Sequence, residues 1–455
     1  MKKILFGLLA ACLATGTVIS CNNKLNVVPV NSIDAANALN TSDDVQAALV
    51  GSYTSLQSAD AYGGYVQFDS DLLADDGDFT FVGTFINPYQ FQRKSIRRDN
   101  TNAQNTWAQG YTVINRANNV LANLDKVTAA ASKTRIEGEA RFLRGLSYFD
   151  LVRLYARAWN DGTPSTNLGV PVVTTPTTVV TNANLLTRNT VAEVYTQIIA
   201  DLTAAEAQLP TNNGIFANKY AAAAIISRVY LQQGRYPEAA AAANRATAGP
   251  YLLNPVYNTE FYQGTDLVAN TPEDIFTIQN SAQSGTNQLN VFYAEKRRGD
   301  VSINSQLLKQ FEAGDARTSL FTAKASQTYS NKYDAQYGTI KLIRLAEMYL
   351  TRAEANFRAG TAVPVGATPL SDVNLVRARV GLPALATVTL PIILKERKLE
   401  LAFEGFRLGD LKRNQESTTD PATGAAVAWN SPRLVLPIPL AEINVNPNLV
   451  QNPGY

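Results

Sequence analysis

Three glutamates near the C-terminus recur at every fourth residue: Glu396, Glu400 and Glu404. This spacing predicts that they lie on one face of a helix, because an α-helix repeats every 3.6 residues. Neighbouring carboxylates could act as the acid and the base of a glycoside hydrolase. Four cations lie among or just after them: Arg397, Lys398, Arg407 and Lys412. We therefore expect ion pairs that position the helix, rather than catalysis.

A second acidic cluster surrounds Gly77 and consists of five aspartates: Asp69, Asp71, Asp75, Asp76 and Asp78. Carboxylate oxygens are the ligands that Ca²⁺ prefers, but this spacing does not match an EF-hand loop. We expect a solvated turn in which aspartates cap helices. We therefore predict no metal site, and a calcium ion held by this cluster is the alternative.

The chain has no histidine, and its two cysteines are Cys12 and Cys21. Without histidine, Ser-His-Asp triads and zinc sites built from Cys and His are excluded. Removal of a signal peptide would also remove Cys12, which excludes a disulfide within the mature chain. We predict that the protein has no cofactor.

The first twenty residues have the layout of a bacterial lipoprotein signal peptide. Lys2 and Lys3 give a positively charged start, and residues 4–19 form an apolar stretch that is short for a transmembrane helix. The stretch ends in Val-Ile-Ser-Cys at residues 18–21, which resembles a lipobox. We predict a signal peptide at 1–20 and a lipid anchor on Cys21. An ordinary signal peptide with a chance cysteine is the alternative.

Size and charge restrict the partners. With 455 residues and 45% hydrophobic content, the chain can build a large core without disulfides. The net charge of +2 argues against nucleic acid as a partner, because such a partner requires a strongly basic face.

Hydrophobic periodicity alternates with polar segments along the chain. Residues 21–40 read as a polar tether, and helical periodicity begins at Ser42, whose side chain suits an N-cap. Periodicity returns at Trp107 and is clear from Ile136 to Phe149. After a Thr-, Pro- and Asn-rich connector at 161–189, three helices are predicted: Val191–Leu209, Tyr220–Gly234 and Pro237–Ala248.

Two regions lack clear periodicity. Residues 60–105 are rich in Gly, Asp, Asn and aromatics, and we predict mostly loop there. Residues 251–338 are rich in Asn, Gln, Gly and Tyr, with one predicted strand at Ile275–Ile278. Irregular regions of this length are usually functional.

One segment resembles a tetratricopeptide turn. Gly234 precedes Ala239, and Ala246 follows seven residues later. Small residues let two antiparallel helices approach closely, and the glycine permits the turn between them. Such a unit cannot bury its face alone, so several should stack, and Leu342–Gly360 offers a further matching helix.

Six separated motifs follow one another toward the C-terminus. They lie at 107–118, 139–155, 344–355, 377–382, 393–413 and 437–455. The most specific is Ile393-x-x-Glu396-Arg397-x-x-Glu400-Leu401-x-x-Glu404-Gly405-x-Arg407-x-x-Asp410-Leu411-x-Arg413. In this order they resemble the SusD/RagB family, and the resemblance runs from residue 21 to residue 455.

The resemblance implies a mostly α-helical fold of tetratricopeptide-like helix pairs with long inserted loops and few short strands. Residues 41–455 would form a single domain, with insertions near 60–105 and 251–338. It also implies a non-catalytic lipoprotein, anchored in the outer membrane and exposed at the cell surface, beside a SusC-like TonB-dependent transporter. The ligand would be a glycan or a peptide. Family members often carry acidic residues just after the lipidated cysteine, and Asn22-Asn23-Lys24 has none.

The two irregular regions supply the predicted ligand contacts. Aromatic rings stack on sugar rings, and side-chain amides bond hydroxyl groups. The predicted contacts are Phe79, Phe81, Asn87, Tyr89, Phe91, Gln92, Asn290, Phe292 and Tyr293. The alternative for each aromatic is that it packs the region onto the scaffold.

Basic clusters accompany both regions: Arg93, Lys94, Arg97 and Arg98 in one, and Lys296, Arg297 and Arg298 in the other. If both face the ligand they favour an anion, and otherwise they are surface charge or contact the transporter. Two other classes of function stay open: a surface glycoside hydrolase, and a tetratricopeptide scaffold that assembles envelope proteins.

Overall fold

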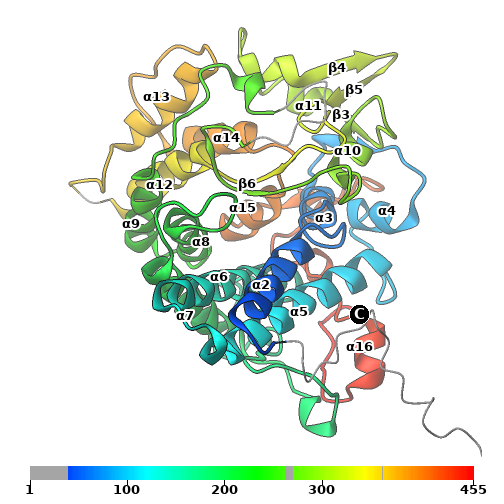
Figure 1. Cartoon of the computed structure of the whole chain (residues 1–455). Coiled ribbons are helices and arrows are strands. Elements are labelled where there is room, and N and C mark those ends of the chain that lie inside the picture. The colour runs from blue at the N-terminus through cyan, green and yellow to red at the C-terminus, as the bar shows by residue number, and fades with distance from the viewer. Residues whose placement is uncertain (1–38, 262–269, 361) are drawn as a thin grey trace, which may run out of the picture.

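The computed structural model describes residues 39–261, 270–360 and 362–455 (Figure 1). It is 49% helix and 7% strand, which confirms the prediction of a mostly α-helical protein. The predicted signal peptide, Cys21 and most of the predicted tether lie outside the described residues. No helix among the described residues is long and apolar enough to cross a membrane.

A row of long helices forms the scaffold. In this row each helix packs on the next, and the row runs from the lower part of Figure 1 to its left side. Its members are α2 (Ser42–Leu56), α5 (Thr101–Ala122), α6 (Ala130–Tyr155), α7 (Val191–Gln208), α8 (Lys219–Gln232), α9 (Tyr236–Thr247) and α12 (Leu345–Ala359). The three helices predicted between residues 191 and 248 are thereby confirmed, each to within one or two residues.

Small side chains determine how closely α8 and α9 pack. Ala239 and Ala246 are fully buried, as the tetratricopeptide-like pattern predicts. Gly234 has a φ of 70° in the turn between the helices, a conformation that glycine adopts without strain. The predicted N-cap at Ser42 is wrong by one residue. Thr41 caps α2, because its hydroxyl accepts from the Asp44 N–H while the Asp44 carboxylate accepts from the Thr41 N–H.

The prediction of mostly loop at 60–105 is wrong. This region contains α3 (Tyr65–Ala74), β1 (Phe79–Phe81) and α4 (Ile86–Gln92). Helix α3 was not predicted because several of its buried residues are polar, so its sequence lacks a clear apolar periodicity. Asp69, for example, is buried because the amide of Asn102 donates to it.

The region at 251–338 is more ordered than its composition suggests. The predicted strand is confirmed as β2 (Asp274–Ile278), which pairs with β6 (Ile340–Arg344) in an antiparallel arrangement that brings Ile278 opposite Ile340. Between them lie α10 (Gln288–Tyr293), β3 (Val301–Ile303), α11 (Ser305–Leu308), β4 (Phe321–Lys324) and β5 (Gln327–Ser330). β4 and β5 pair with each other within this region. β3 pairs with β1, so the region contacts the first irregular region at 60–105.

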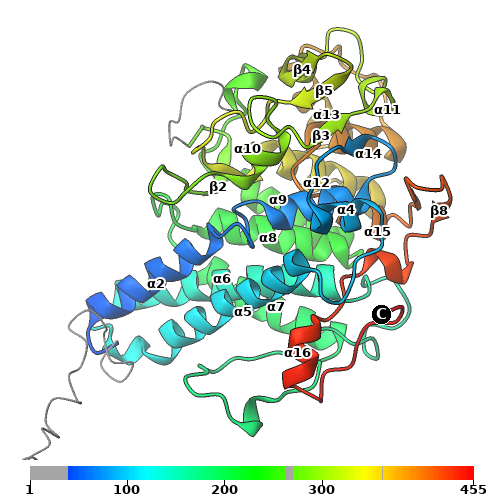
Figure 2. The same cartoon turned by 90° about the vertical axis from the view of Figure 1, so that its right-hand side faces the viewer.

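The C-terminal part adds further helices and ends in a segment that packs back on the scaffold. It contains α13 (Pro369–Arg379), α14 (Leu390–Glu400), α15 (Arg407–Arg413), β7 (Thr418–Thr419), β8 (Ala426–Val427) and α16 (Leu440–Val445). Its last segment returns to the scaffold, where the Leu436 N–H donates to the Leu154 carbonyl. Figure 2 shows α16 at the lower end of the molecule, beside the connector at 161–189, where the amides of Asn446 and Asn448 donate to backbone carbonyls.

Candidate functional site: an amide-lined groove beside a buried ionic network

The three regularly spaced glutamates are buried. Glu396 and Glu400 lie in the last turns of α14, whereas Glu404 lies beyond the end of that helix. Their partners are the cations Arg317, Lys332, Arg344, Arg377 and Arg379, which come from other parts of the chain. The prediction that ion pairs position the helix is confirmed. The prediction that nearby cations provide them is wrong.

The local cations have other partners. Arg397 pairs with Asp410 at 2.9 Å, and Lys398 pairs with Asp78 at 2.6 Å. Arg407 pairs with Asp76 and Glu416, and the buried amine of Lys412 has no hydrogen-bond partner among the described residues. Spacing along one helix could not reveal that the glutamates and the nearby cations pair with other residues, because every partner comes from a different segment.

Arg344 is the centre of the network. Its guanidinium lies 2.8 Å from a carboxylate oxygen of Glu273, 3.0 Å from one of Glu400 and 2.8 Å from one of Glu404. Burial alone would raise the pKa of Glu400, but the guanidinium groups of Arg379, Arg344 and Arg317 outweigh burial and hold it well below its usual range. A carboxylate held ionised in this way cannot serve as a general acid.

The glycine of the Glu404-Gly405 pair is required by close packing. Gly405 has a φ of 80°, and a Cβ at this position would lie 2.7 Å from the Cα of Gln67. Its N–H donates to Asp71 at 3.1 Å, which joins the turn to α3. The motif thus reflects packing between the C-terminal part and the first irregular region.

The acidic cluster around Gly77 is not a solvated turn, contrary to the prediction. All of its members except Asp76 are buried. Asp75 accepts the N–H groups of Gly77, Asp78 and Phe79, and burial raises its pKa to about 6. Burial raises the pKa of Asp71 to about 8, although the Tyr293 hydroxyl and the Gly405 N–H donate to it. No acidic cluster of the described residues is arranged to hold a metal ion.

Most of the predicted ligand contacts lie in the core. Phe79, Phe81, Phe91, Gln92, Asn290, Phe292 and Tyr293 are all buried. Phe292 stacks on Phe68 with ring centroids 4.2 Å apart, and the Asn290 amide donates to the carbonyls of Tyr333 and Asp334. These side chains therefore pack the two irregular regions together, and Phe79 also lines a small cavity beside Asp71.

Asn87 and Tyr89 keep access to solvent. Both lie on α4, and the Tyr89 ring is 38% exposed, with the Arg93 guanidinium 4.9 Å from its centroid. Beside it, Phe85 is 45% exposed and the Arg298 guanidinium lies 4.0 Å from its centroid. Phe85 escaped prediction, although it lies within the same aromatic stretch.

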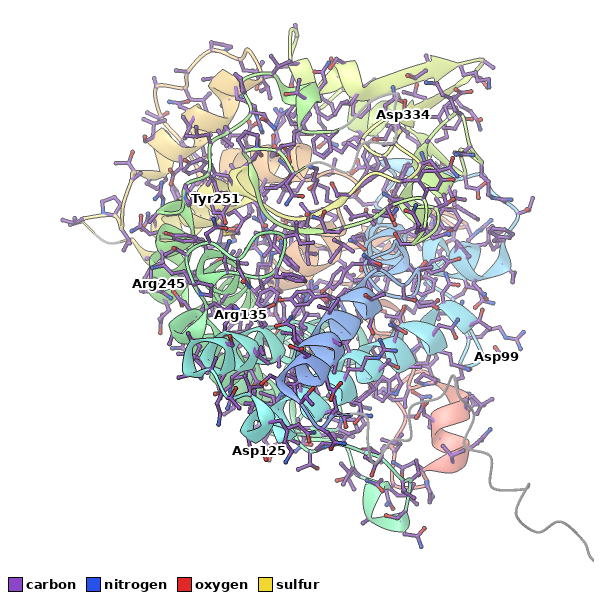
Figure 3. All side chains as sticks on the ribbon, viewed as in Figure 1. Asp99, Asp125, Arg135, Arg245, Tyr251 and Asp334 are labelled. Carbon is purple, nitrogen blue, oxygen red and sulfur yellow. The ribbon has the colours of Figure 1, made fainter. Side chains whose placement is uncertain are left out.

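The two basic clusters are largely paired. Arg97 pairs with Asp99, Lys296 with Asp334, and Arg298 with Asp300. Lys94 is buried and donates to the carbonyls of Asp75 and Gln92. Figure 3 shows Asp99 and Asp334 on the right-hand side of the molecule, Asp99 below α4 and Asp334 above it. Neither cluster lines the groove described next.

A groove of about 460 Å³ opens where α2 and α5 meet the ends of β2 and α10. Its lining residues are Thr54, Ser55, Gln57, Ser58, Ala59, Gly63, Gln109, Thr112, Arg116, Ile278, Asn280, Ser284, Gly285, Thr286, Asn287, Gln288 and Ile340. A smaller pocket of about 130 Å³ shares Thr54, Gln57 and Ile278 with it, and continues toward the rings of Tyr53, Phe216 and Phe276.

The chemistry of the groove is unusual for its lack of charge. Arg116 is the one charged side chain among the described residues that line it, and no aromatic ring does so. Side-chain amides and hydroxyls dominate, which suits a ligand rich in hydroxyl groups. The abundance of Asn and Gln in 251–338 was the one sequence signal for the side of the groove that this region forms. No sequence signal indicated that Gln57 and Gln109 line the helical side.

Two family models match the chain. One, described as the SusD family, matches residues 256–455, and the other, described as starch-binding associating with outer membrane, matches residues 34–231. The chain belongs to the SusD family. Its six sequence motifs and its helical scaffold are therefore those of a SusD-family protein.

Two similar proteins share nearly the whole length of this SusD-family chain, and a third shares about a quarter of it. SusD-like protein P2 of Formosa agariphila is 26% identical over 96% of this chain and 97% of its own. The starch-binding protein SusD of Bacteroides thetaiotaomicron is 37% identical over 26% of this chain and 21% of its own. A putative sugar binding protein from Bacteroides vulgatus has a solved structure with a TM-score of 0.82 and 29% identity, covering 92% of this chain and 99% of its own.

Proposed function

We propose that this SusD-family protein is a non-catalytic outer-membrane lipoprotein that captures a glycan and passes it to a SusC-like TonB-dependent transporter. The uncharged, amide-lined groove carries the proposal, because such a wall suits hydroxyl groups. The names of the similar proteins, one starch-binding and one sugar binding, support a glycan over a peptide.

The carboxylates support binding over hydrolysis. A glycosidase requires two carboxyl groups that face a sugar-sized cavity across a few ångströms. Glu396, Glu400 and Glu404 are instead buried in ion pairs. Asp71 has a raised pKa, but the cavity that it lines has a volume of about 40 Å³, which is far too small for a sugar ring.

The N-terminal sequence supports attachment to the membrane. In our proposal, residues 1–20 are the signal peptide, Cys21 carries the lipid, and residues 21–40 tether a domain at 41–455. A chain extends by about 3.3–3.6 Å per residue, so a tether of this length could reach a few tens of ångströms from the membrane.

An exposed surface on and before α4 supports a protein partner. Val82, Phe85, Ile86 and Tyr89 are all exposed large apolar side chains, and arginines lie over both rings. Aromatic residues and arginine are enriched in the centres of protein interfaces. In our proposal this surface contacts the transporter.

Calorimetric titration of the mature chain from Asn22 with oligosaccharides and peptides tests the proposal. We expect saturable binding of a glycan, no release of reducing ends during incubation, and copurification of the lipidated protein with a transporter barrel. Turnover of the glycan would contradict the non-catalytic role. Binding of peptides alone would contradict the ligand class.

A matched pair of variants separates ligand capture from partner contact. Ile86→Glu should abolish copurification with the transporter while glycan binding by the isolated chain persists. Val256→Glu changes an equally apolar and exposed position elsewhere and should change neither. Loss of copurification in both variants would point to a general loss of folding.

A further inference from the structure

One amide in the groove has an unused donor. Asn280 is 7% exposed and lines the groove, and its Oδ1 accepts from the Ser284 hydroxyl at 2.9 Å. Its Nδ2 has no hydrogen-bond partner among the described residues. A buried N–H group without an acceptor is costly, so a ligand oxygen that reaches this amide gains more than it would from a solvated one.

Two further amides present acceptors. The Nε2 of Gln57 donates to the Gln279 carbonyl at 2.6 Å, and the Nε2 of Gln109 donates to the Ser55 carbonyl at 2.7 Å. Only the NH₂ end of an amide can donate to a carbonyl, so these bonds fix which end is oxygen. No described residue donates to either Oε1, and both glutamines line the groove.

The three amides are neighbours. Gln57 bonds the residue that precedes Asn280, and Gln109 bonds a carbonyl in the last turn of α2, two residues before Gln57. The lining of the groove therefore includes one buried donor without a partner and two acceptors whose orientation is fixed. Arg116, its one charged lining residue, lies on its exposed side and donates to the Gly51 carbonyl at 2.6 Å.

We infer that Asn280, Gln57 and Gln109 select a neutral, hydroxyl-rich glycan and disfavour glycans that carry carboxylate or sulfate groups. The inference rests on the proposed function and names the ligand class of that groove. A hydroxyl group both donates and accepts, so neighbouring sugar hydroxyls can satisfy the donor and both acceptors. A carboxylate or sulfate group only accepts hydrogen bonds. It could accept from Asn280, but its negative charge would then lie against the side-chain oxygens of Gln57 and Gln109.

Titrations with neutral and anionic probes of the same length test the inference. We would titrate the mature chain from Asn22 with neutral hexasaccharides of glucose, mannose, xylose and galactose, and with hexagalacturonate as the anionic probe of the same length. One or more of the neutral hexasaccharides should bind about tenfold more tightly than hexagalacturonate. This is the affinity ratio that the net free energy of one hydrogen bond provides. The preference should persist at high salt, because it arises from hydrogen-bond pattern rather than long-range charge.

Two variants test Asn280 and Gln109, and a third is the matched control. Asn280→Asp replaces the free donor with an acceptor and should weaken binding of the neutral glycan about tenfold or more. Gln109→Lys replaces an acceptor with a cationic donor and should shift the preference toward hexagalacturonate. Asn182→Asp makes the same chemical change at an exposed position outside the groove and should leave both affinities unchanged.

The outcomes separate the inference from the proposed function. Binding of hexagalacturonate as tightly as the neutral probes, or an Asn280→Asp variant with unchanged affinity, would overturn the inference and leave a glycan-binding protein. Absence of binding to every probe, by the isolated chain and by its complex with the transporter, would overturn both. Thermal melting of each variant would show that a lost affinity is not a lost fold.

Discussion

The buried ionic network and the groove differ in how they use polar side chains. In the network, charged groups are removed from water and paired; Arg344 alone contacts three carboxylates. In the groove, charge is nearly absent, and Asn280 keeps a donor free. Buried charges must be paired to be tolerated, whereas uncharged amides can stay partly unpaired at moderate cost. Paired charges therefore join distant segments of the SusD-family fold here, and in our proposal the neutral polar groups serve recognition.

The largest expected effect comes from breaking the network. Arg344→Met leaves Glu273, Glu400 and Glu404 short of a partner, and we expect a loss of about 3–5 kcal/mol in the free energy of unfolding. Urea denaturation followed by circular dichroism would measure it. Arg97→Met, which removes an exposed ion pair with Asp99, is the control and should leave the urea midpoint essentially unchanged, because water and salt screen such a pair. A similar small loss in both variants would remove the contrast between network and surface.

Asp71 sharpens the comparison through its pH dependence. Burial raises its pKa to about 8 in the folded protein, so the folded state binds more protons than the unfolded state between pH 4 and pH 8. Stability contributed at this site therefore falls as pH rises through that range. Asp71→Asn should be more stable than wild type by a few kcal/mol at pH 8 and equal to it near pH 4, because each unit of raised pKa corresponds to about 1.4 kcal/mol. Equal urea midpoints at both pH values would contradict the buried, neutral carboxyl.

Lys412 is a buried cation that the network does not pair. Burial lowers its pKa to about 7, and its Nζ has no hydrogen-bond partner among the described residues. Between pH 7 and its ordinary value the unfolded state binds more protons, so stability rises with pH. Lys412→Met should therefore gain about 1–2 kcal/mol at pH 7, and the gain should shrink toward pH 10. A destabilised variant would indicate a partner for the amine.

The smallest expected effect lies in the groove. Gln288 lines it, and no hydrogen bond of its side chain to another described residue is present. Gln288→Ala should leave the melting temperature within about 1–2 °C of wild type, because nothing in the fold depends on the amide. Glycan affinity measured by calorimetry should fall about three- to fivefold. A drop in melting temperature without a change in affinity would make Gln288 a structural residue.

Local patterns predicted the scaffold well because it is made of local contacts. The period from Ile136 to Phe149 and the turn at Gly234 identify α6, α8 and α9 without knowledge of the rest of the chain. Helix α3 was missed because its polar residues face inward, toward partners far away in sequence, as Asp69 does with Asn102. The same property hid the partners of Glu400, which come from four other segments.

The candidate site was predicted only as a region. Aromatic residues such as Phe292 and Tyr293 suggested stacking, yet their size and apolarity place them in the core. The groove is lined largely by amides, and its helical side carries Gln57, just after α2, and Gln109 on α5, a helix with many other amide side chains. A sequence cannot distinguish a glutamine that faces a groove from one that faces open solvent.

The antiparallel pair of β2 and β6 closes the base of the segment between residues 278 and 340. The two ends of this segment are held against each other, so its exposed turns can change in length at little cost to the rest of the chain. Its buried contacts are fixed, because Arg317 and Lys332 pair with the glutamates of the network and β3 pairs with β1. Each doubling of such a closed loop costs only about 0.6 kcal/mol in chain entropy. Exchange of the exposed turns between relatives, with β2, β6, β3 and the two network cations kept, is thus a route by which evolution or an engineer could install a new specificity on an unchanged frame.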